Sequence, residues 1–157
     1  MNLSHIALTL SLLGTPTVYA GTPTHSHGTP TSHHTSALSE RDMNRVLAAI
    51  RIVESNNDPS AVGDNGNAIG VYQIWRSYFR DAVEFGNLDL EYRDCFVPVH
   101  ADTVVRSYMR RYATERRLGR PVTMQDIARI HNGGPNGYKK QATVKYWKKV
   151  KAILDAG

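Results

Sequence analysis

Two acidic residues, Glu54 and Asp64, stand ten positions apart in surroundings that suit acid–base chemistry. Glu54 ends a stretch with helical periodicity, and Asp64 lies in the turn-rich segment that follows. Two facing carboxyl groups are the minimum equipment for cleaving a glycosidic bond, because one donates a proton to the leaving oxygen and the other attacks or stabilises the sugar. The sequence therefore nominates this pair as catalytic.

The helical periodicity places Glu54 against a buried face. At about 100° per residue, Val46, Leu47, Ile50 and Val53 share one stripe, and Glu54 falls inside it. A carboxyl group that faces a buried stripe loses the solvation of its charged form, which favours the protonated state that a general acid needs. The alternative is that Glu54 is merely the last, solvated residue of the helix.

The segment after Glu54 predicts a loop and a short β-hairpin. Pro59 disfavours helical backbone in the residue before it, and residues 63–67 are rich in types that tolerate positive φ. The flanking pairs at 61–62 and 68–69 are apolar, so we expect a hairpin that folds Asp64 back toward the helix end. Asp64 could instead be only a turn residue that accepts backbone hydrogen bonds.

The N-terminal residues are expected to lie outside the folded domain. A short apolar run at 6–13 and small residues ending at Ala20 are typical of a signal peptide, predicted at 1–20. Residues 21–38 are mainly Thr, Ser, Pro, Gly and His and predict a disordered leader, whose histidines could bind a metal ion loosely. We therefore expect secretion, to the extracellular space or the periplasm, and a catalytic domain at 39–157.

The charge balance points to an anionic partner. The formal net charge is +5, and all 19 Lys and Arg residues lie beyond residue 40, with clusters at 106–120 and 139–151. A basic exported protein suits the anionic bacterial wall, although ordinary solvated helix faces would explain about half of these charges. No nucleic-acid-binding signature is present. The apolar run is too short for stable membrane insertion, and we expect a monomer.

The remaining patterns predict a mostly helical α+β domain. Helices are expected at 39–54, 75–83, 102–117, 123–132 and 142–154, with an irregular segment at 84–98. About five helices and one small hairpin give an α+β fold dominated by helix. The single Cys95 excludes an internal disulfide and leaves dimerisation or a buried thiol as alternatives.

Three motifs occur in the order found in the lysozyme-like superfamily: Glu54-Ser55, then Gly-Val-Tyr-Gln-Ile at 70–74, then His-Asn-Gly-Gly-Pro-Asn-Gly at 131–137. Together they resemble the invertebrate-type (destabilase-type) lysozymes over about residues 45–150. The string at 131–137 is highly specific, whereas Glu-Ser alone is weak. The resemblance implies a lysozyme-like fold.

The resemblance also implies roles for individual residues. Glu54 would be the proton donor, and Asp64 is the best match for the family's catalytic aspartate. The residues expected to bind the sugar are Tyr72, Gln73, Arg76, Tyr78, Asp81, His131, Asn132 and Gly133. Tyr72, Trp75 and Tyr78 offer aromatic faces, although core packing is the expected use of at least one of them. No cofactor and no metal are expected.

The chain departs from this family at its cysteines. Family members are usually rich in cysteine, but Asn57, Ala82 and Tyr138 stand near the positions concerned. The sequence also resembles, more distantly, the bacterial lytic transglycosylases, which share the Glu-Ser motif and lack the catalytic aspartate.

The sequence thus predicts a retaining muramidase that hydrolyses the β-1,4 bond between N-acetylmuramic acid and N-acetylglucosamine in peptidoglycan. The alternatives are a lytic transglycosylase that yields 1,6-anhydro products and a non-catalytic peptidoglycan-binding protein. No Ser-His-Asp or Cys-His spacing supports a protease site.

Overall fold

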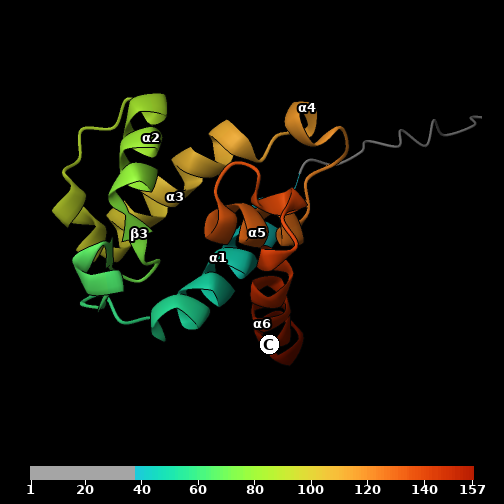
Figure 1. Cartoon of the computed structure of the whole chain (residues 1–157), viewed down its shortest axis with the longest axis horizontal. Helices are drawn as coiled ribbons and strands as arrows, with labels where there is room; N and C mark the ends of the chain where they lie inside the picture. Colours follow the sequence, from blue (N-terminus) through green and yellow to red (C-terminus); the bar gives the residue numbers. More distant parts are fainter. Residues whose placement is uncertain (1–37) are drawn as a thin grey trace, which may run out of the picture. The chain divides into compact units, whose positions relative to one another are not determined.

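The computed structural model describes residues 38–157, so the predicted signal peptide and nearly all of the predicted leader lie outside the described residues. The elements in chain order are α1 (Glu40–Ser55), β1 (Val62–Gly63), the 3-10 turn η1 (Asp64–Gly66), β2 (Ala68–Ile69), β3 (Ile74–Trp75), α2 (Arg76–Gly86), η2 (Tyr92–Phe96), α3 (Pro98–Tyr112), α4 (Glu115–Leu118), α5 (Met124–Gly133), η3 (Gly137–Lys139) and α6 (Ala142–Ala156). Figure 1 shows α2 and β3 on one side of this domain, α5 and α6 on the other, and α1 and α3 running between them. The prediction of a mostly helical α+β fold is confirmed.

Capping residues set the two ends of helix α1. The Ser39 side chain caps it by accepting a hydrogen bond from the Asp42 amide at 3.1 Å. The helix ends before Asn56, whose left-handed backbone (φ 54°) lets its amide bond back to two carbonyls of the last turn. Its buried face carries Val46, Leu47, Ala49 and Ile50. Glu54 therefore stands one residue before the end of a helix anchored in the core.

The predicted hairpin is present, and it gains a third strand. β1 pairs with β2 and β2 with β3, both antiparallel, with Ala68 opposite Trp75 in the second pair. Trp75, which was expected to open the following helix, lies in β3 instead. Gln73 adopts a positive φ of 48°, which reverses the chain and brings Ile74–Trp75 back alongside β2. Helix α2 consequently begins at Arg76.

The predicted bounds of the long helix, 102–117, are wrong at both ends. It begins at Pro98, because proline suits the first helical position, where no amide donor is needed. It ends at Tyr112, and Thr114 then caps the separate short helix α4 by accepting from the Arg117 amide. The segment before α3 is also more ordered than predicted, since it contains η2.

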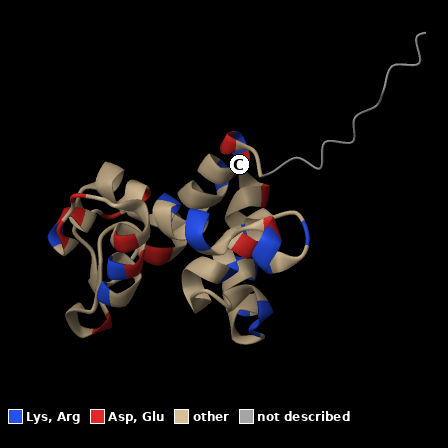
Figure 2. Ribbon diagram, turned by 90° about the horizontal axis from the view of Figure 1, so that it is seen from above, with Lys and Arg blue, Asp and Glu red and all other residues tan. Residues whose placement is uncertain are grey.

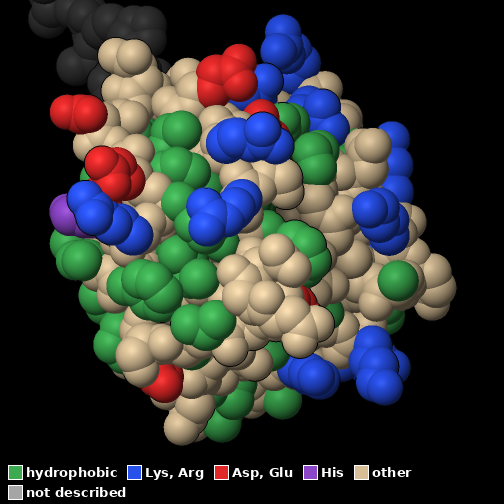
Figure 3. Space-filling view, turned by 60° about the vertical axis from the view of Figure 1, so that its left-hand side comes forward, with side chains coloured by type: hydrophobic (Ala, Val, Ile, Leu, Met, Phe, Trp, Pro, Cys, Tyr) green, Lys and Arg blue, Asp and Glu red, His purple; other side chains and the backbone are tan. Residues whose placement is uncertain are grey.

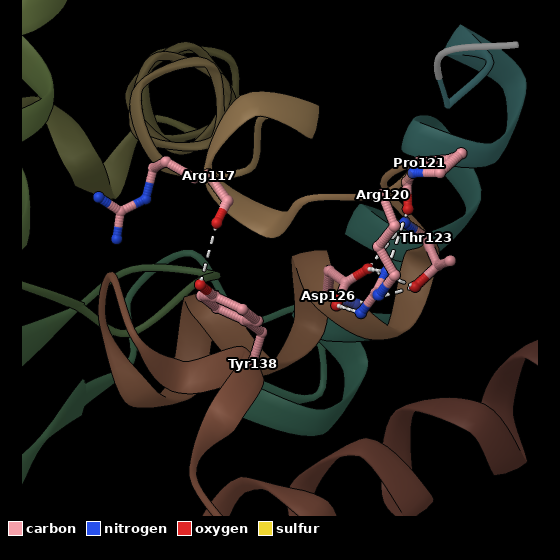
Figure 4. Close-up of polar contacts among 6 residues, drawn as sticks. All are labelled: Arg117, Arg120, Pro121, Thr123, Asp126 and Tyr138. Atoms are coloured by element: carbon pink, nitrogen blue, oxygen red, sulfur yellow. Dashed lines mark hydrogen bonds and ion pairs between the residues drawn. The ribbon is translucent and has the colours of Figure 1, made fainter. Parts of the chain in front are cut away.

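The loop between α4 and α5 is held by a polar network (Figure 4). Thr123, the first residue of the helix expected at 123–132, is the N-cap of α5 and forms a reciprocal capping box with Asp126. Asp126 is only 1% exposed, and both of its carboxylate oxygens accept hydrogen bonds from the Arg120 guanidinium at 2.7 Å. Tyr138 in η3 donates to the Arg117 carbonyl oxygen at 3.2 Å, which links the turn after α5 to α4.

One hydrophobic core joins the helices. α1 packs on α5 and α6, and α2 packs on α3. The largest fully buried side chains include Tyr72, Leu47, Ile50, Met109 and Ile130. Within residues 38–157, none of the helices combines the length and apolarity needed to cross a membrane.

The surface charges are dispersed over several helices (Figure 2). In the basic cluster at 106–120, Arg106 pairs with Asp102, Arg111 with Asp81, and Arg120 with Asp126. Three arginines of this cluster therefore form ion pairs within the domain. Figure 3 shows exposed hydrophobic side chains lying between basic ones on one face.

Candidate active site

A cavity of about 290 Å³ lies where the end of α1, the hairpin and the end of α5 meet. Its lining consists of Glu54, Gly63, Asp64, Gln73, Trp75, Tyr78, His131 and Asn132. Both acids nominated from the sequence thus border the same cavity, together with four of the eight residues predicted to bind sugar.

The carboxyl group of Glu54 is partly withdrawn from solvent and held by the neighbouring helices. Its side chain is 19% exposed. Its Oε1 accepts a hydrogen bond from the hydroxyl of Tyr146 on α6 at 2.7 Å. Nε2 of His131 on α5 lies 3.6 Å from the same oxygen. Glu54 is therefore not the freely solvated helix end that the sequence left open as an alternative.

Asp64 has a different environment. It opens η1 with a left-handed backbone (φ 47°), a conformation that Asp tolerates better than most residues. Its backbone carbonyl accepts from the Asn67 side chain at 2.9 Å. Its carboxylate, however, has no hydrogen-bond or ion-pair partner among the residues that the structure describes. The side chain is thus exposed beside the cavity and is not used to stabilise the turn.

Gln73 braces the hairpin beneath the cavity. Its Nε2 donates to the carbonyl oxygens of Gly70 at 3.0 Å and of Ala61 at 3.3 Å. This double contact ties the two ends of the hairpin together, so Gln73 helps fix the position of Asp64 as well as lining the cavity.

His131 is buried at the cavity floor. Its Nε2 lies 3.1 Å from the Tyr72 carbonyl oxygen, and its Nδ1 lies 3.4 Å from the Tyr78 hydroxyl. Burial lowers the pKa of His131, an effect that the nearby Glu54 and the bond to Tyr72 only partly offset. His131 is consequently neutral near pH 7 and does not act as a cation against Glu54.

A second hollow of about 380 Å³ adjoins the first. It shares Trp75, Tyr78, His131 and Asn132 with it and extends to Ser77, Asp81, Tyr108, Gly134 and Pro135. Trp75 is 48% exposed and borders both hollows. Asp81 is already committed, because it pairs with Arg111 at 2.7 Å and accepts a hydrogen bond from Tyr112. The two hollows together form an extended depression suited to a chain-like ligand.

A sequence model of the family described as Destabilase matches residues 43–153. The chain belongs to the destabilase family. An invertebrate-type lysozyme of Ruditapes philippinarum is 35% identical over 85 residues, covering 54% of this chain and 59% of that protein. Invertebrate-type lysozyme 6 of Caenorhabditis elegans is 33% identical over 108 residues, covering 64% and 78%.

The fold of this destabilase-family domain also matches a solved structure. A crystal structure of an inhibitor-bound lysozyme from Meretrix lusoria superimposes with a TM-score of 0.60 at 33% identity, covering 69% of this chain and 88% of that one. The resemblance stated from the motifs is thereby confirmed. The matched region spans only 59% of the Ruditapes protein's own length.

Three residues predicted to bind sugar lie elsewhere in this destabilase-family domain. Tyr72 is fully buried, and its hydroxyl donates to Asp102 at 2.7 Å, so its ring offers no face to a ligand. The Arg76 guanidinium lies 4.3 Å from the centre of the Tyr92 ring and borders a separate hollow. Gly133 packs against α6, where an added Cβ would meet the Thr143 methyl at 2.5 Å.

One site residue was missed by sequence reasoning. Tyr146 is absent from the predicted site residues, because the apolar periodicity of α6 draws attention to Val144, Trp147 and Val150 instead. Its contact with Glu54 spans 92 positions of sequence, and no local signal encodes it.

No three His, Cys, Asp or Glu side chains gather into a metal-binding group within residues 38–157. The histidines at 25–34 lie outside the described residues.

Proposed function

We propose that this domain is a muramidase, a glycoside hydrolase that cleaves the β-1,4 bond between N-acetylmuramic acid and N-acetylglucosamine in peptidoglycan. The observation that carries the proposal is the single cavity bordered by both Glu54 and Asp64. Two carboxyl groups in contrasting environments can take different roles, one as acid and one as carboxylate. Membership of the destabilase family and the lysozyme relatives support this class of reaction.

In the proposed reaction, protonated Glu54 gives its proton to the glycosidic oxygen. The carboxyl O–H bond breaks, and the electron pair of the bond between the sugar's anomeric carbon and that oxygen stays with the leaving oxygen. Asp64 attacks or stabilises the anomeric carbon. Glu54 then removes a proton from water, and the oxygen of that water bonds to the anomeric carbon while the bond or ion contact to Asp64 breaks. Asp64 leaves as a carboxylate, Glu54 is protonated again, and the configuration of the sugar is retained. This scheme requires carboxyl groups about 5 to 5.5 Å apart.

The glycan would run across both adjoining hollows. Trp75 presents an exposed ring that can stack on a sugar, and the exposed Asn132 side chain offers an amide for acetamido and hydroxyl groups. The Tyr78 ring lines both hollows, but its hydroxyl is engaged by His131.

The decisive experiment replaces the proposed acid. Glu54→Gln keeps the shape of the side chain and removes its proton, so release of fragments from purified peptidoglycan should fall by roughly 10²- to 10⁴-fold. Glu84→Gln on the exposed surface of α2 is the matched control and should keep full activity. Full activity in the Glu54→Gln protein would end the proposal.

Asp64→Asn separates the two glycan-cleaving reactions. A hydrolase that uses Asp64 should lose most of its activity, and the wild type should release fragments with ordinary reducing ends. Normal activity of Asp64→Asn, together with 1,6-anhydro products by mass spectrometry, would identify a lytic transglycosylase. Binding of peptidoglycan without release of fragments by the wild type would identify a non-catalytic protein.

We further propose that the protein is exported and meets peptidoglycan as its partner outside the cytoplasm. The support is the pattern of residues 1–20 and the basic surface. N-terminal sequencing of the protein recovered outside the cell tests this proposal, which predicts a chain that begins at Gly21.

A further inference from the structure

Side chains from two distant helices converge on one oxygen of Glu54. The Tyr146 hydroxyl on α6 donates to Oε1 at 2.7 Å, and Nε2 of His131 on α5 lies 3.6 Å from the same atom. Within the part of the chain that the structure describes, no hydrogen bond reaches Oε2. The two oxygens of this carboxyl group therefore have different surroundings.

The contacts of His131 fix which of its nitrogens carries the proton. Nε2 lies 3.1 Å from the Tyr72 carbonyl oxygen, which can only accept, so Nε2 carries the hydrogen. In the neutral ring Nδ1 is then the acceptor, and the Tyr78 hydroxyl donates to it. The N–H of His131 thus faces both the Tyr72 carbonyl and Oε1 of Glu54.

Neither neighbour of Glu54 carries protons in the reaction. Burial lowers the pKa of His131, which therefore stays neutral near pH 7. Burial and the negative charge of Glu54 raise the pKa of Tyr146, so its hydroxyl remains a donor at any pH at which the enzyme would work. Both groups are fixed dipoles with their positive ends toward Oε1.

We propose that Tyr146 and His131 are positioning residues that give the two oxygens of Glu54 separate tasks. The Tyr146 hydroxyl holds Oε1 by a hydrogen bond, and the His131 N–H, whose nitrogen lies 3.6 Å away, adds an electrostatic attraction to the same oxygen. Oε2 carries the proton that the glycosidic oxygen receives. An oxygen that already accepts a hydrogen bond is the poorer site for the acid's own proton, and holding it stops rotation of the carboxyl group. This inference rests on the proposed function.

Tyr146→Phe tests the inference by removing one hydroxyl. We expect kcat on purified peptidoglycan to fall about tenfold to hundredfold, because the carboxyl group loses its orientation, with KM changed less than about twofold. The hydroxyl stabilises the ionised carboxyl more than the neutral acid. Its loss should therefore move the alkaline limb of the kcat/KM profile upward by about one pH unit.

Tyr138→Phe is the matched control. It removes a hydroxyl that also makes one hydrogen bond, to the Arg117 carbonyl oxygen, and Tyr138 borders neither hollow of the site (Figure 4). Its kcat and pH profile should equal those of the wild type. A shift of the alkaline limb in Tyr138→Phe as large as in Tyr146→Phe would show a general effect on the fold and would overturn the inference.

A pair of variants at His131 supplies a second test that holds even if Tyr146→Phe fails to fold. His131→Gln keeps an N–H donor at similar reach, and His131→Leu fills the space without one. We expect the Gln variant to retain at least about tenfold more kcat than the Leu variant, both measured on folded protein as judged by thermal unfolding. Equal kcat in the two variants would overturn the role of His131.

The result for Glu54→Gln separates this inference from the proposed function. If Glu54→Gln is inactive while Tyr146→Phe keeps the wild-type kcat and pH profile, the positioning role is wrong and the muramidase proposal stands. If Glu54→Gln is fully active, the muramidase proposal itself fails, and the positioning role fails with it.

Discussion

Removing the charge of Asp126 should destabilise the domain strongly at neutral pH and much less in acid. Asp126 is 1% exposed and accepts two hydrogen bonds from Arg120 and two from Thr123, all between 2.7 and 3.0 Å. Breaking a buried ion pair by removing one partner typically costs about 3–5 kcal/mol. The Arg120 side chain is 49% exposed and can regain water, so we expect the lower end, about 3 kcal/mol for Asp126→Asn.

The pKa of Asp126 sets the pH dependence of this contribution. Burial by itself raises the pKa, but the hydrogen bonds from Arg120 and Thr123 outweigh burial and hold the pKa below the ordinary value of 3.8. The unfolded chain therefore takes up the proton more readily than the folded one. The stabilisation is complete above about pH 4 and is lost as the pH falls through the lowered pKa.

Thermal and urea unfolding at pH 7 and at pH 3 or below measure this difference. At pH 7, Asp126→Asn should lower the melting temperature by roughly 10 °C, given about 3–5 °C per kcal/mol for a domain of this size. Asp155→Asn is the control, because its pair with Lys151 is exposed and should contribute less than about 0.5 kcal/mol. The reasoning is refuted if the two variants lose equal stability at pH 7, or if the deficit of Asp126→Asn stays constant into acid.

Three further outcomes follow from the packing of particular residues. Gly137→Ala should lower the free energy of unfolding by at least about 3 kcal/mol, because the new Cβ would lie 1.9 Å from the Arg129 carbonyl oxygen. Gly119→Ala is the control: its Cβ would meet no atom within 4 Å, so it should cost only the strain of its left-handed backbone, about 1–2 kcal/mol. Cys95 is fully buried and burial raises its pKa to about 12, so a disulfide-exchange reagent at pH 8 should label it only after denaturation; rapid labelling of folded protein would contradict this burial. Trp75→Ala should raise KM on peptidoglycan while leaving kcat within about twofold, and an unchanged KM would exclude its ring from substrate contact.

The features predicted correctly from the sequence are those encoded by neighbouring residues. The stripe of α1 placed Glu54 against the core, and Ser39 and Thr123 marked helix starts because a cap depends on groups only three positions away. The turn residues at 63–67 predicted the hairpin for the same reason, since positive φ is a property of single residues. Local chemistry was sufficient in each case.

The features that were missed depend on tertiary contacts. Tyr72 lies between two residues with left-handed backbone, Gly70 and Gln73, so the segment 70–73 follows neither the helical nor the strand period. Periodicity therefore could not show that the Tyr72 ring is buried. The same limit applies to Tyr146, whose hydrogen bond to Glu54 exists only once α1 and α6 have packed together.

In this domain, hydrogen bonds are found near positions where the resemblance to the family leads us to expect disulfide-forming cysteines. Tyr138, near a position where the resemblance leads us to expect cysteine, donates a hydrogen bond to the Arg117 carbonyl oxygen and links η3 to α4 (Figure 4). Ala82, near another, is fully buried, and its carbonyl accepts from the Ser107 hydroxyl at 2.7 Å. Each such bond contributes about 1 kcal/mol, against typically about 2–4 kcal/mol for a disulfide.

These weaker links have a consequence for the site. The turn at 134–137 is held by hydrogen bonds and by close packing at Gly137, so its rigidity depends on the fold around it. The chain's only cysteine is fully buried, and no disulfide is available to be reduced. Reducing agents should therefore leave the melting temperature and the rate on peptidoglycan unchanged. Acid, which weakens the Asp126 network at the start of α5, should instead loosen the helix that carries His131 at its other end.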